Sequence, residues 1–311
     1  MKNRSILFLL ACISFLQYAQ SAACQYNFEP GDSYFLSQVM IQNTETENNE
    51  FSGNVSLDLR FTLLIEVKKI TAEGNYLFSC RYKDLALGFF APQSEISINS
   101  QSNEFLPFKE YLLKLEKNPF EMLFSRYGEI LNIWKLDSTI NTFYFDKSKD
   151  AKKHQLIIKT IKEGFGEASL KGVSNICLHV YSVEQTKSVT MESSILFNAK
   201  TIDIQNKFYY MPLTDGNMRI QGIGMIPENI DSLKNNRMSM KTIMKGNQTY
   251  DLLFAKDMGW IIDGISKQKI QSISILEGHP DLPDGLQIPS FTDTEYRFSG
   301  GRIEKNPTKK K

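Results

Sequence analysis

A long run of alternating apolar and polar residues begins at Leu57 and constrains the fold of this chain more than any other feature. Apolar residues recur at every second position as far as Val67. A period of two gives one buried and one solvated face, which is typical of a half-buried β-strand. A turn containing Gly74 follows, since glycine readily adopts positive φ, and a second alternating run starts at Tyr76. We therefore predict a long amphipathic β-hairpin over residues 57–87.

Further strand-like runs lie on both sides of one helical segment. Residues 146–162 have charged first turns and an apolar stripe that includes Leu156 and Ile161, the pattern of a surface helix. Gly164 and Gly166 are expected to end this helix. Strands are expected on either side of it, at 34–41, 120–134, 176–183, 189–204, 208–226 and 250–275.

Turn residues separate some of these strands, and other segments are expected to leave the sheet. Asp215-Gly216 lies between two apolar runs and predicts a tight hairpin turn. The polar segment 91–103 and the segment 227–236 are expected to be loops. After residue 276 the chain contains several prolines, which disfavour sheet pairing because proline has no backbone N–H.

The predicted fold class is mainly β, with antiparallel sheets in two halves and a connecting helical segment. The predicted division of the chain is a signal peptide at 1–23, an N-terminal β half at 24–145, a helical connector at 146–172, a C-terminal β half at 173–276, and an irregular tail rich in proline and glycine with a basic end at 277–311.

The first residues have the features of an export signal. Lys2 and Arg4 precede an apolar run too short to span a bilayer, and small residues follow it, as in secretory signal peptides. Cys24 comes next and is a candidate for lipid attachment, although Ser21 stands where a lipobox has a large aliphatic residue. The mature protein is expected in the periplasm, at the outer-membrane surface or outside the cell. If Cys24 is lipidated, that lipid anchor would be its only link to a membrane.

Charge and cysteine content limit the partners and the covalent framework. The formal net charge is +1, so nucleic acid is not expected as a partner, because such binding depends on a strong positive field. Cys80 and Cys177 either pair in a disulfide, as export would permit, or remain simple buried thiols.

The sequence contains no recognisable catalytic, metal or cofactor motif. It has no nucleophile elbow, metalloprotease helix or phosphate-binding loop, so no catalytic residue, metal or cofactor is predicted. His154, His179 and His279 are far apart in sequence, and surface or structural roles are expected for all three. The adjacent Phe208, Tyr209 and Tyr210 point to both faces of a strand. We expect a sheet packed on both faces, and these three residues are the candidate aromatics if one face instead lines a ligand groove.

The order of the turn and strand signals resembles an uncharacterised family of exported, β-rich envelope proteins of Gram-negative bacteria, many of them lipoproteins. The signals that carry the resemblance are Phe28, Pro30, Gly31 and Tyr34 at the start of the mature chain, Gly74 and Tyr76 in the hairpin, Phe124 and Gly128 in the second hairpin, and Tyr250, Gly259 and Ile261 late in the chain. The resemblance implies an envelope location and carries no activity.

Two functions follow as hypotheses. The first is an exported, non-enzymatic protein that binds a protein partner or an apolar ligand on a curved sheet at the cell envelope. The alternative is a hydrolase whose site is assembled from distant loops. A histidine within hydrogen-bond reach of both a carboxylate and a Ser or Cys would favour the hydrolase.

Overall fold

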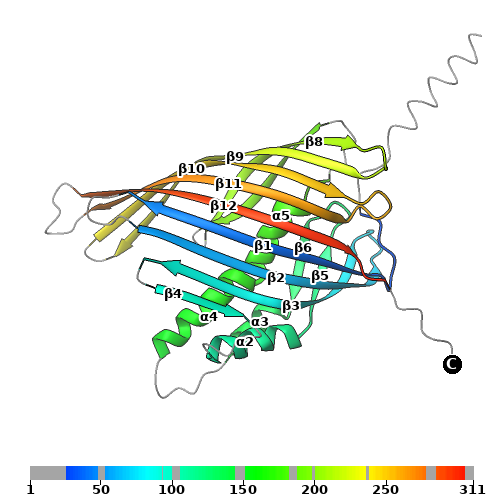
Figure 1. The fold of residues 1–311 in the computed structure, drawn as a ribbon, viewed down its shortest axis with the longest axis horizontal. Coiled ribbons are helices and arrows are strands. Elements are labelled where there is room, and N and C mark those ends of the chain that lie inside the picture. Colours follow the sequence, from blue (N-terminus) through cyan, green and yellow to red (C-terminus); the bar gives the residue numbers. More distant parts are fainter. Residues whose placement is uncertain are drawn as a thin grey trace, which may run out of the picture.

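The computed structural model describes residues 26–47, 53–92, 94–99, 106–143, 151–181, 188–197, 200–235, 238–277 and 285–304. The predicted signal peptide, Cys24 and His279 lie outside these residues. The described part of the chain forms one antiparallel sheet of twelve strands, with helices against its concave face (Figure 1). The predicted mainly β, antiparallel fold class is confirmed.

The elements of the first half precede the long helices. They are β1 (Ser33–Thr46), β2 (Gly53–Ile70), β3 (Tyr76–Ala91), β4 (Ser94–Asn99), α2 (Leu106–Lys117), β5 (Phe120–Phe124), β6 (Ile130–Trp134) and α3 (Leu136–Asn141). The remaining elements are α4 (Ala151–Phe165), α5 (Glu167–Cys177), β7 (Ser188–Phe197), β8 (Lys200–Pro212), β9 (Met218–Asn235), β10 (Met238–Phe254), β11 (Ile261–Glu277) and β12 (Leu286–Arg302).

The predicted hairpin is present as β2 and β3. The two strands pair antiparallel from Ser56↔Phe90 to Ile70↔Tyr76. Gly74 has a φ of 80° in the connecting turn, the left-handed conformation that favours glycine. The inward side chains of β2 are almost fully buried from Phe61 to Val67, as the alternation predicts. The hairpins β5–β6 and β8–β9 are likewise confirmed.

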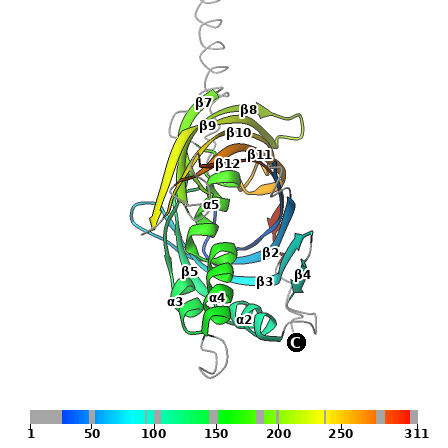
Figure 2. The same cartoon turned by 90° about the vertical axis from the view of Figure 1, so that its left-hand side faces the viewer.

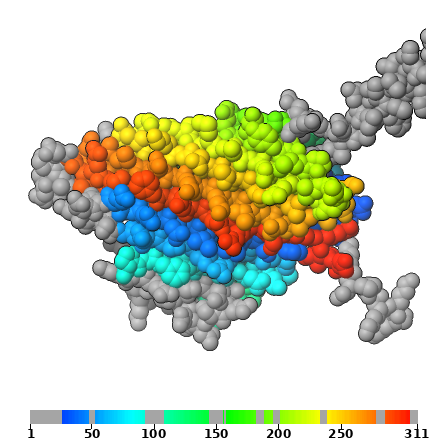
Figure 3. Space-filling view, turned by 45° about the horizontal axis from the view of Figure 1, so that its top comes forward, coloured from blue at the N-terminus to red at the C-terminus, as the bar shows by residue number. Residues whose placement is uncertain are grey.

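The two halves form one continuous sheet, in the order β6-β5-β3-β2-β1-β12-β11-β10-β9-β8-β7, with β4 paired to β3. β1 and β12, the first and last strands along the chain, are neighbours in the middle of the sheet. β1 pairs with β12 from Tyr34↔Arg302 to Thr46↔Ser290. Figure 3 shows β12 between β1 and β11 on the convex face. A helical segment still connects the halves along the chain, as predicted.

The prediction of an irregular tail at 277–311 is wrong, because residues 286–302 form a central strand. Pro289 misled the prediction, since proline is normally confined to sheet edges. Here the pairing between β1 and β12 stops at Thr46↔Ser290, and just beyond it the Glu47 N–H donates a hydrogen bond to the carbonyl of Pro289, at 3.1 Å. The missing N–H of Pro289 therefore lies beyond the end of the pairing with β1, where no β1 residue needs it as a donor.

Three other local predictions are also corrected. Part of the polar segment 91–103 is β4, paired to β3. A loop was predicted at 227–236, but β9 continues through this segment as far as Asn235. A register shift in the pairing with β10, between Met244 and Gly246, accommodates the residues around Pro227. In place of the strand predicted at 176–183, residues 176–177 end α5 and residues 178–180 form turns, whereas residues 182–183 lie outside the described residues.

The predicted helix at 146–162 corresponds to α4, but a second helix that was not predicted follows it directly. Gly166 separates the two helices in an extended conformation, and a Cβ there would lie 2.4 Å from the carbonyl oxygen of Lys162. Glycine therefore breaks the helix and also lets α5 start at once. Figure 2 shows the sheet curving around α4 and α5.

Helix α5 lies between the two edges of the sheet. The Asn175 side chain donates a hydrogen bond to the Ser194 carbonyl in β7, at 2.8 Å. On the other side, the Ser174 hydroxyl donates to the Gly128 carbonyl between β5 and β6, at 2.9 Å. One helix thus hydrogen-bonds to the β5–β6 turn at one edge of the sheet and to β7 at the other edge.

Candidate functional site

The concave face has three zones along the strands. The first is an aromatic core at the end where the N-terminal residues enter. Trp260 is 1% exposed and donates a hydrogen bond to the Phe35 carbonyl at 2.9 Å. Tyr26 and Phe28 pack edge-on against Trp260, with ring centroids 5.9 and 5.6 Å from it. This zone is dense and internally hydrogen-bonded, so it positions the sheet rather than a ligand.

The second zone is a band of buried, uncharged polar side chains that crosses the C-terminal half. Its members are Asn206, Gln248, Ser266, Gln268, Thr292 and Thr294. The Gln248 Nε2 donates to the Ser266 Oγ at 2.8 Å, and the Gln268 Nε2 donates to the Gln248 Oε1 at 3.3 Å. The amides of the band thus largely satisfy one another, which offsets the cost of burying them.

The band is joined across β9 because β9 has glycine on its concave face there. Tyr250 on β10 donates a hydrogen bond to the Asn206 Oδ1 on β8, at 2.6 Å. Gly222 and Gly224 lie between them, and a Cβ on Gly224 would lie 2.4 Å from that Oδ1. Any larger residue at Gly224 would therefore break the link between β8 and β10.

The third zone is a second apolar cluster, beyond the polar band. It consists of Ile202, Ile204, Ile226, Met244 and Ile270, each at most 3% exposed. Ile226 and Ile270 both pair with Gly246, which lies between them in the sheet. Among the described residues this cluster contains only strand side chains, whereas helices contribute to the main core. Side chains on one sheet face lie side by side, so their burial requires a layer above that face.

The predicted groove aromatics divide between the two faces. Phe208 is fully buried on the concave face, with its ring 5.1 Å from that of Tyr250. Tyr210 lies on the same face, and its hydroxyl donates to the Val180 carbonyl at 2.6 Å. Tyr209 is 43% exposed on the convex face. Phe208 and Tyr210 are therefore structural neighbours of the polar band, and Tyr209 is separate from it.

The polar band was missed from the sequence, although a signal for it exists. Tyr250, Leu252 and Phe254 share one face of a predicted strand. Gln248 lies two residues before Tyr250, so the same alternation puts it on that buried face. Asn206 stands in the same relation to Phe208. A polar residue with inward parity in a buried strand is the pattern that would have revealed the band.

The structure shows Cys80 and Cys177 as free, buried thiols, so the candidate disulfide is not formed. Burial raises the pKa of both thiols, and neither thiolate forms readily near neutral pH. Both cysteines therefore act as small apolar core residues.

The histidines are not brought into a catalytic arrangement within the described residues. His179 follows α5 instead of facing outward from a strand, and its burial lowers its pKa. No Ser or Cys hydrogen bond to the described His179 ring is present. His154 lies in α4, in a part whose side chains are not described. In the described part of the chain, no three His, Cys, Asp or Glu side chains are grouped as metal ligands.

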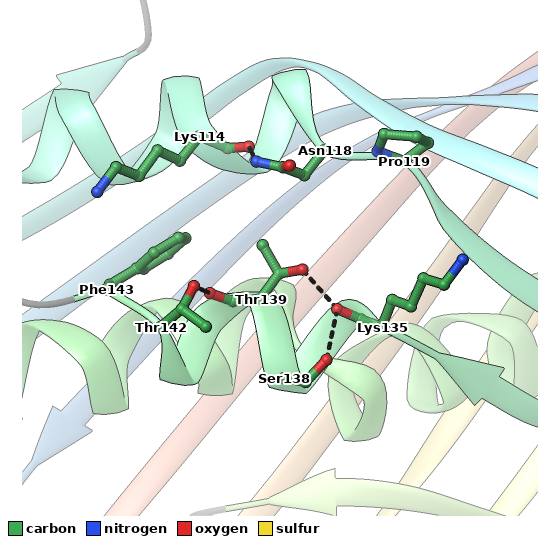
Figure 4. Close-up of a pocket in the computed structure, with 8 residues that line it drawn as sticks. All are labelled: Lys114, Asn118, Pro119, Lys135, Ser138, Thr139, Thr142 and Phe143. Atoms are coloured by element: carbon green, nitrogen blue, oxygen red, sulfur yellow. Dashed lines mark hydrogen bonds between the residues drawn. The ribbon is translucent and has the colours of Figure 1, made fainter.

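A groove of about 470 Å³ lies between α2 and α3 and contains Lys114 and Lys135 (Figure 4). Its lysine ammonium groups point toward opposite ends of the groove, so they do not converge on an anion. The Ser138 and Thr139 hydroxyls donate to the Lys135 carbonyl, at 3.1 and 2.6 Å. Their protons are therefore committed to the helix, and the groove offers few donors to a ligand.

The sequence matches a family of unknown function (DUF6263) over residues 73–261. The chain belongs to this family. No curated protein matches it. Among the helices that the structure describes, none combines the length and apolar character needed to cross a membrane.

Comparison with solved structures shows a distant likeness in fold. A lipovitellin structure is similar with a TM-score of 0.50 and 11% identity, over 92% of this chain. The chain spans 27% of the length of that lipovitellin chain. OpdD from Pseudomonas aeruginosa matches with a TM-score of 0.19 and 8% identity, over 89% of this chain and 100% of its own. A TM-score this low does not indicate a shared fold.

Proposed function

We propose that this protein binds an apolar ligand on the concave face of its sheet and catalyses no reaction. One observation carries the proposal: Ile202, Ile204, Ile226, Met244 and Ile270 form a buried apolar cluster that is separate from the main core. A polar band divides the two clusters, so the second cluster is not simply an extension of the core. Concave, apolar surfaces with a few placed polar groups are typical of ligand sites.

The fold likeness supports this proposal in a limited way. The lipovitellin structure that the chain resembles concerns lipid–protein interactions. The export signal predicted at residues 1–23 supports an envelope or extracellular location, where lipidation of Cys24, if it occurs, would provide the membrane link. No observation favours the hydrolase over a binding protein.

The proposal is tested with a hydrocarbon probe, diphenylhexatriene, whose fluorescence rises in an apolar site. We expect saturable binding to the full chain. Ile226→Phe should crowd the second cluster with a larger side chain and weaken the binding at least tenfold. Ile223→Phe on the same strand is the matched control, because Ile223 is 57% exposed on the convex face, and it should leave the affinity unchanged.

Two results would contradict the proposal. Absence of probe binding to the wild-type protein would remove the ligand site altogether. Equal effects of Ile226→Phe and Ile223→Phe, with both variants folded by circular dichroism, would place the probe elsewhere.

A further inference from the structure

Gln38 carries an unusual buried amide on the concave face of β1. It is 3% exposed, and it pairs across the sheet with Phe61 and Phe298. Its Oε1 atom is fully buried and has no hydrogen-bond partner among the residues described. Exchanging the amide oxygen and nitrogen only replaces the buried acceptor with a buried donor. Buried polar groups without partners destabilise a fold, so this amide needs an explanation.

Tyr296 offers a second open polar group on the neighbouring strand. Its ring stacks on that of Phe298, with centroids 6.2 Å apart. Burial raises the pKa of its hydroxyl to about 12, yet the side chain is only partly covered. No hydrogen bond of this hydroxyl is found within the described part of the chain. The hydroxyl therefore remains able to donate and to accept.

The register of β1 and β12 places these two groups together. Tyr296 pairs with Met40, and Gln38 is the next residue of β1 on the same face. Gln38 and Tyr296 are thus diagonal neighbours, whose Cα atoms are roughly 7–8 Å apart, within reach of long side chains. They lie beside Ser266, which pairs with Tyr296 and belongs to the polar band.

The band itself leaves little free capacity for a ligand. Gln248, Gln268 and Ser266 hydrogen-bond to one another. The second apolar cluster begins at Ile270, four residues along β11 from Ser266, which is roughly 13 Å at the rise of an extended strand. A ligand with its polar end at Gln38 and Tyr296 would therefore have its apolar part over the second cluster.

Charge limits the chemistry of that polar end. Within the described residues, the only buried side chain of a charged type is Asp32, and it is paired with Arg302 at the aromatic end. A phosphate or carboxylate at Gln38 would meet no buried cation among the described residues, and burying an unpaired ion is strongly unfavourable. Hydroxyl and amide groups carry no such penalty when they are hydrogen-bonded.

From this placement we infer that Gln38 and Tyr296 form the polar recognition point for a neutral amphiphile, a ligand with an apolar chain and an uncharged hydroxyl or amide group. The Gln38 Oε1 accepts the ligand's O–H or N–H, and the Tyr296 hydroxyl donates to a ligand oxygen. This inference rests on the proposed function and adds the class of ligand to it.

Competition against diphenylhexatriene tests the inference on the full chain. Monooleoylglycerol and oleate share an acyl chain but differ in head group, which is neutral in the first and ionised in the second. We expect monooleoylglycerol to displace the probe at least tenfold more effectively. Tyr296→Phe should weaken monooleoylglycerol binding by about 3- to 10-fold, the usual effect of one lost hydrogen bond. Tyr209→Phe on the convex face of β8 is the matched control.

Gln38→Leu provides a second and independent readout. It removes the unpartnered amide, so the ligand-free variant should melt at a higher temperature than the wild type and bind monooleoylglycerol less tightly. A lower melting temperature would show that the amide is already satisfied without ligand and would overturn the inference.

The outcomes separate the two proposals. If the hydrocarbon probe binds but oleate competes as well as monooleoylglycerol, or Tyr296→Phe behaves like Tyr209→Phe, the apolar site stands and the neutral recognition point is wrong. If the probe does not bind at all, both proposals fail.

Discussion

The two apolar clusters on the concave face differ in composition and in what they contact. The main core is rich in aromatic rings, and helical residues such as Tyr111, Leu115 and Leu170 contribute to it. The second cluster has one methionine and four isoleucines, all from strands. Both are equally inaccessible, so burial alone does not distinguish a structural core from a binding surface.

Hydrogen bonding sharpens the difference. In the main core, the hydroxyls of Tyr26 and Tyr82 donate to the carbonyls of Leu178 and Phe165, at 2.8 and 3.0 Å. These bonds fix the helices onto the sheet. Such tyrosines link one layer to another, whereas the side chains of the second cluster have no hydroxyl that could form such a bond.

The largest expected effect is on Trp260, at the centre of the aromatic core. Trp260→Ala should reduce the free energy of unfolding by about 3–5 kcal/mol, because it leaves a large cavity and removes a buried hydrogen bond. Urea unfolding measures the change. Trp134→Ala is the control, since Trp134 is 39% exposed, and we expect a loss of less than about 1 kcal/mol. Similar losses at both positions would contradict the description of the core.

A pair of substitutions on β10 compares the two clusters directly. Leu252 lies in the main core and Met244 in the second cluster, both on the concave face. Leu252→Ala should cost about 2–5 kcal/mol. Met244→Ala should cost less than Leu252→Ala if the second cluster is the proposed ligand surface, because a site that admits ligands can readjust around a smaller side chain. Chemical unfolding of both variants measures this.

Ligand should further separate this pair. A saturating hydrocarbon probe stabilises the wild type by about 2.7 kcal/mol at a hundred times its dissociation constant. We expect Leu252→Ala to retain that increment and Met244→Ala to lose part of it. Equal destabilisation by the two variants, with no difference in ligand response, would make the second cluster an ordinary part of the core.

The smallest effect concerns pH and the ion pair at the aromatic end. Burial alone would raise the pKa of the Asp32 carboxyl, but hydrogen bonds from Arg302 and Tyr34 hold that pKa below its usual value. Because the folded-state pKa is lowered, the stabilisation is present above about pH 4, the ordinary carboxyl pKa, and is lost as pH falls through the folded-state value.

Asp32→Asn should therefore reduce the unfolding free energy by about 1.5 kcal/mol at pH 7, and the difference from wild type should vanish in acid. Asp58→Asn is the matched control, because Asp58 pairs with a largely exposed Arg60, and exposed pairs contribute about 0–1 kcal/mol. A constant difference between wild type and Asp32→Asn from pH 7 to pH 3 would contradict this assignment.

Regular alternation made the long hairpin at 57–87 predictable from sequence, and the Asp215-Gly216 turn identified the β8–β9 hairpin. The failures have local causes. Pro289 suggested an irregular tail, because sequence does not show that its partner strand ends beside it. Gly166 was interpreted as the end of a helical region, whereas it separates two helices.

The candidate site was predictable only in part. Phe208 was selected from sequence, but as a groove aromatic, and it is a fully buried neighbour of the polar band. The band and the pair Gln38 and Tyr296 depend on which strands become neighbours. Strand order and register are set by contacts between distant residues, and no local pattern in β1 indicates that β12 will lie beside it.

The pairing of β1 with β12 joins residues 34–46 to residues 290–302. During synthesis from the N-terminus, the strands of the first half emerge long before β12, so one edge of β1 stays unpaired until nearly the whole chain is available. Such distant pairing slows folding, because a long loop must close before any contact stabilises it. An open strand edge also invites association with other chains. We therefore expect chains truncated before residue 286 to aggregate rather than to fold as a smaller sheet.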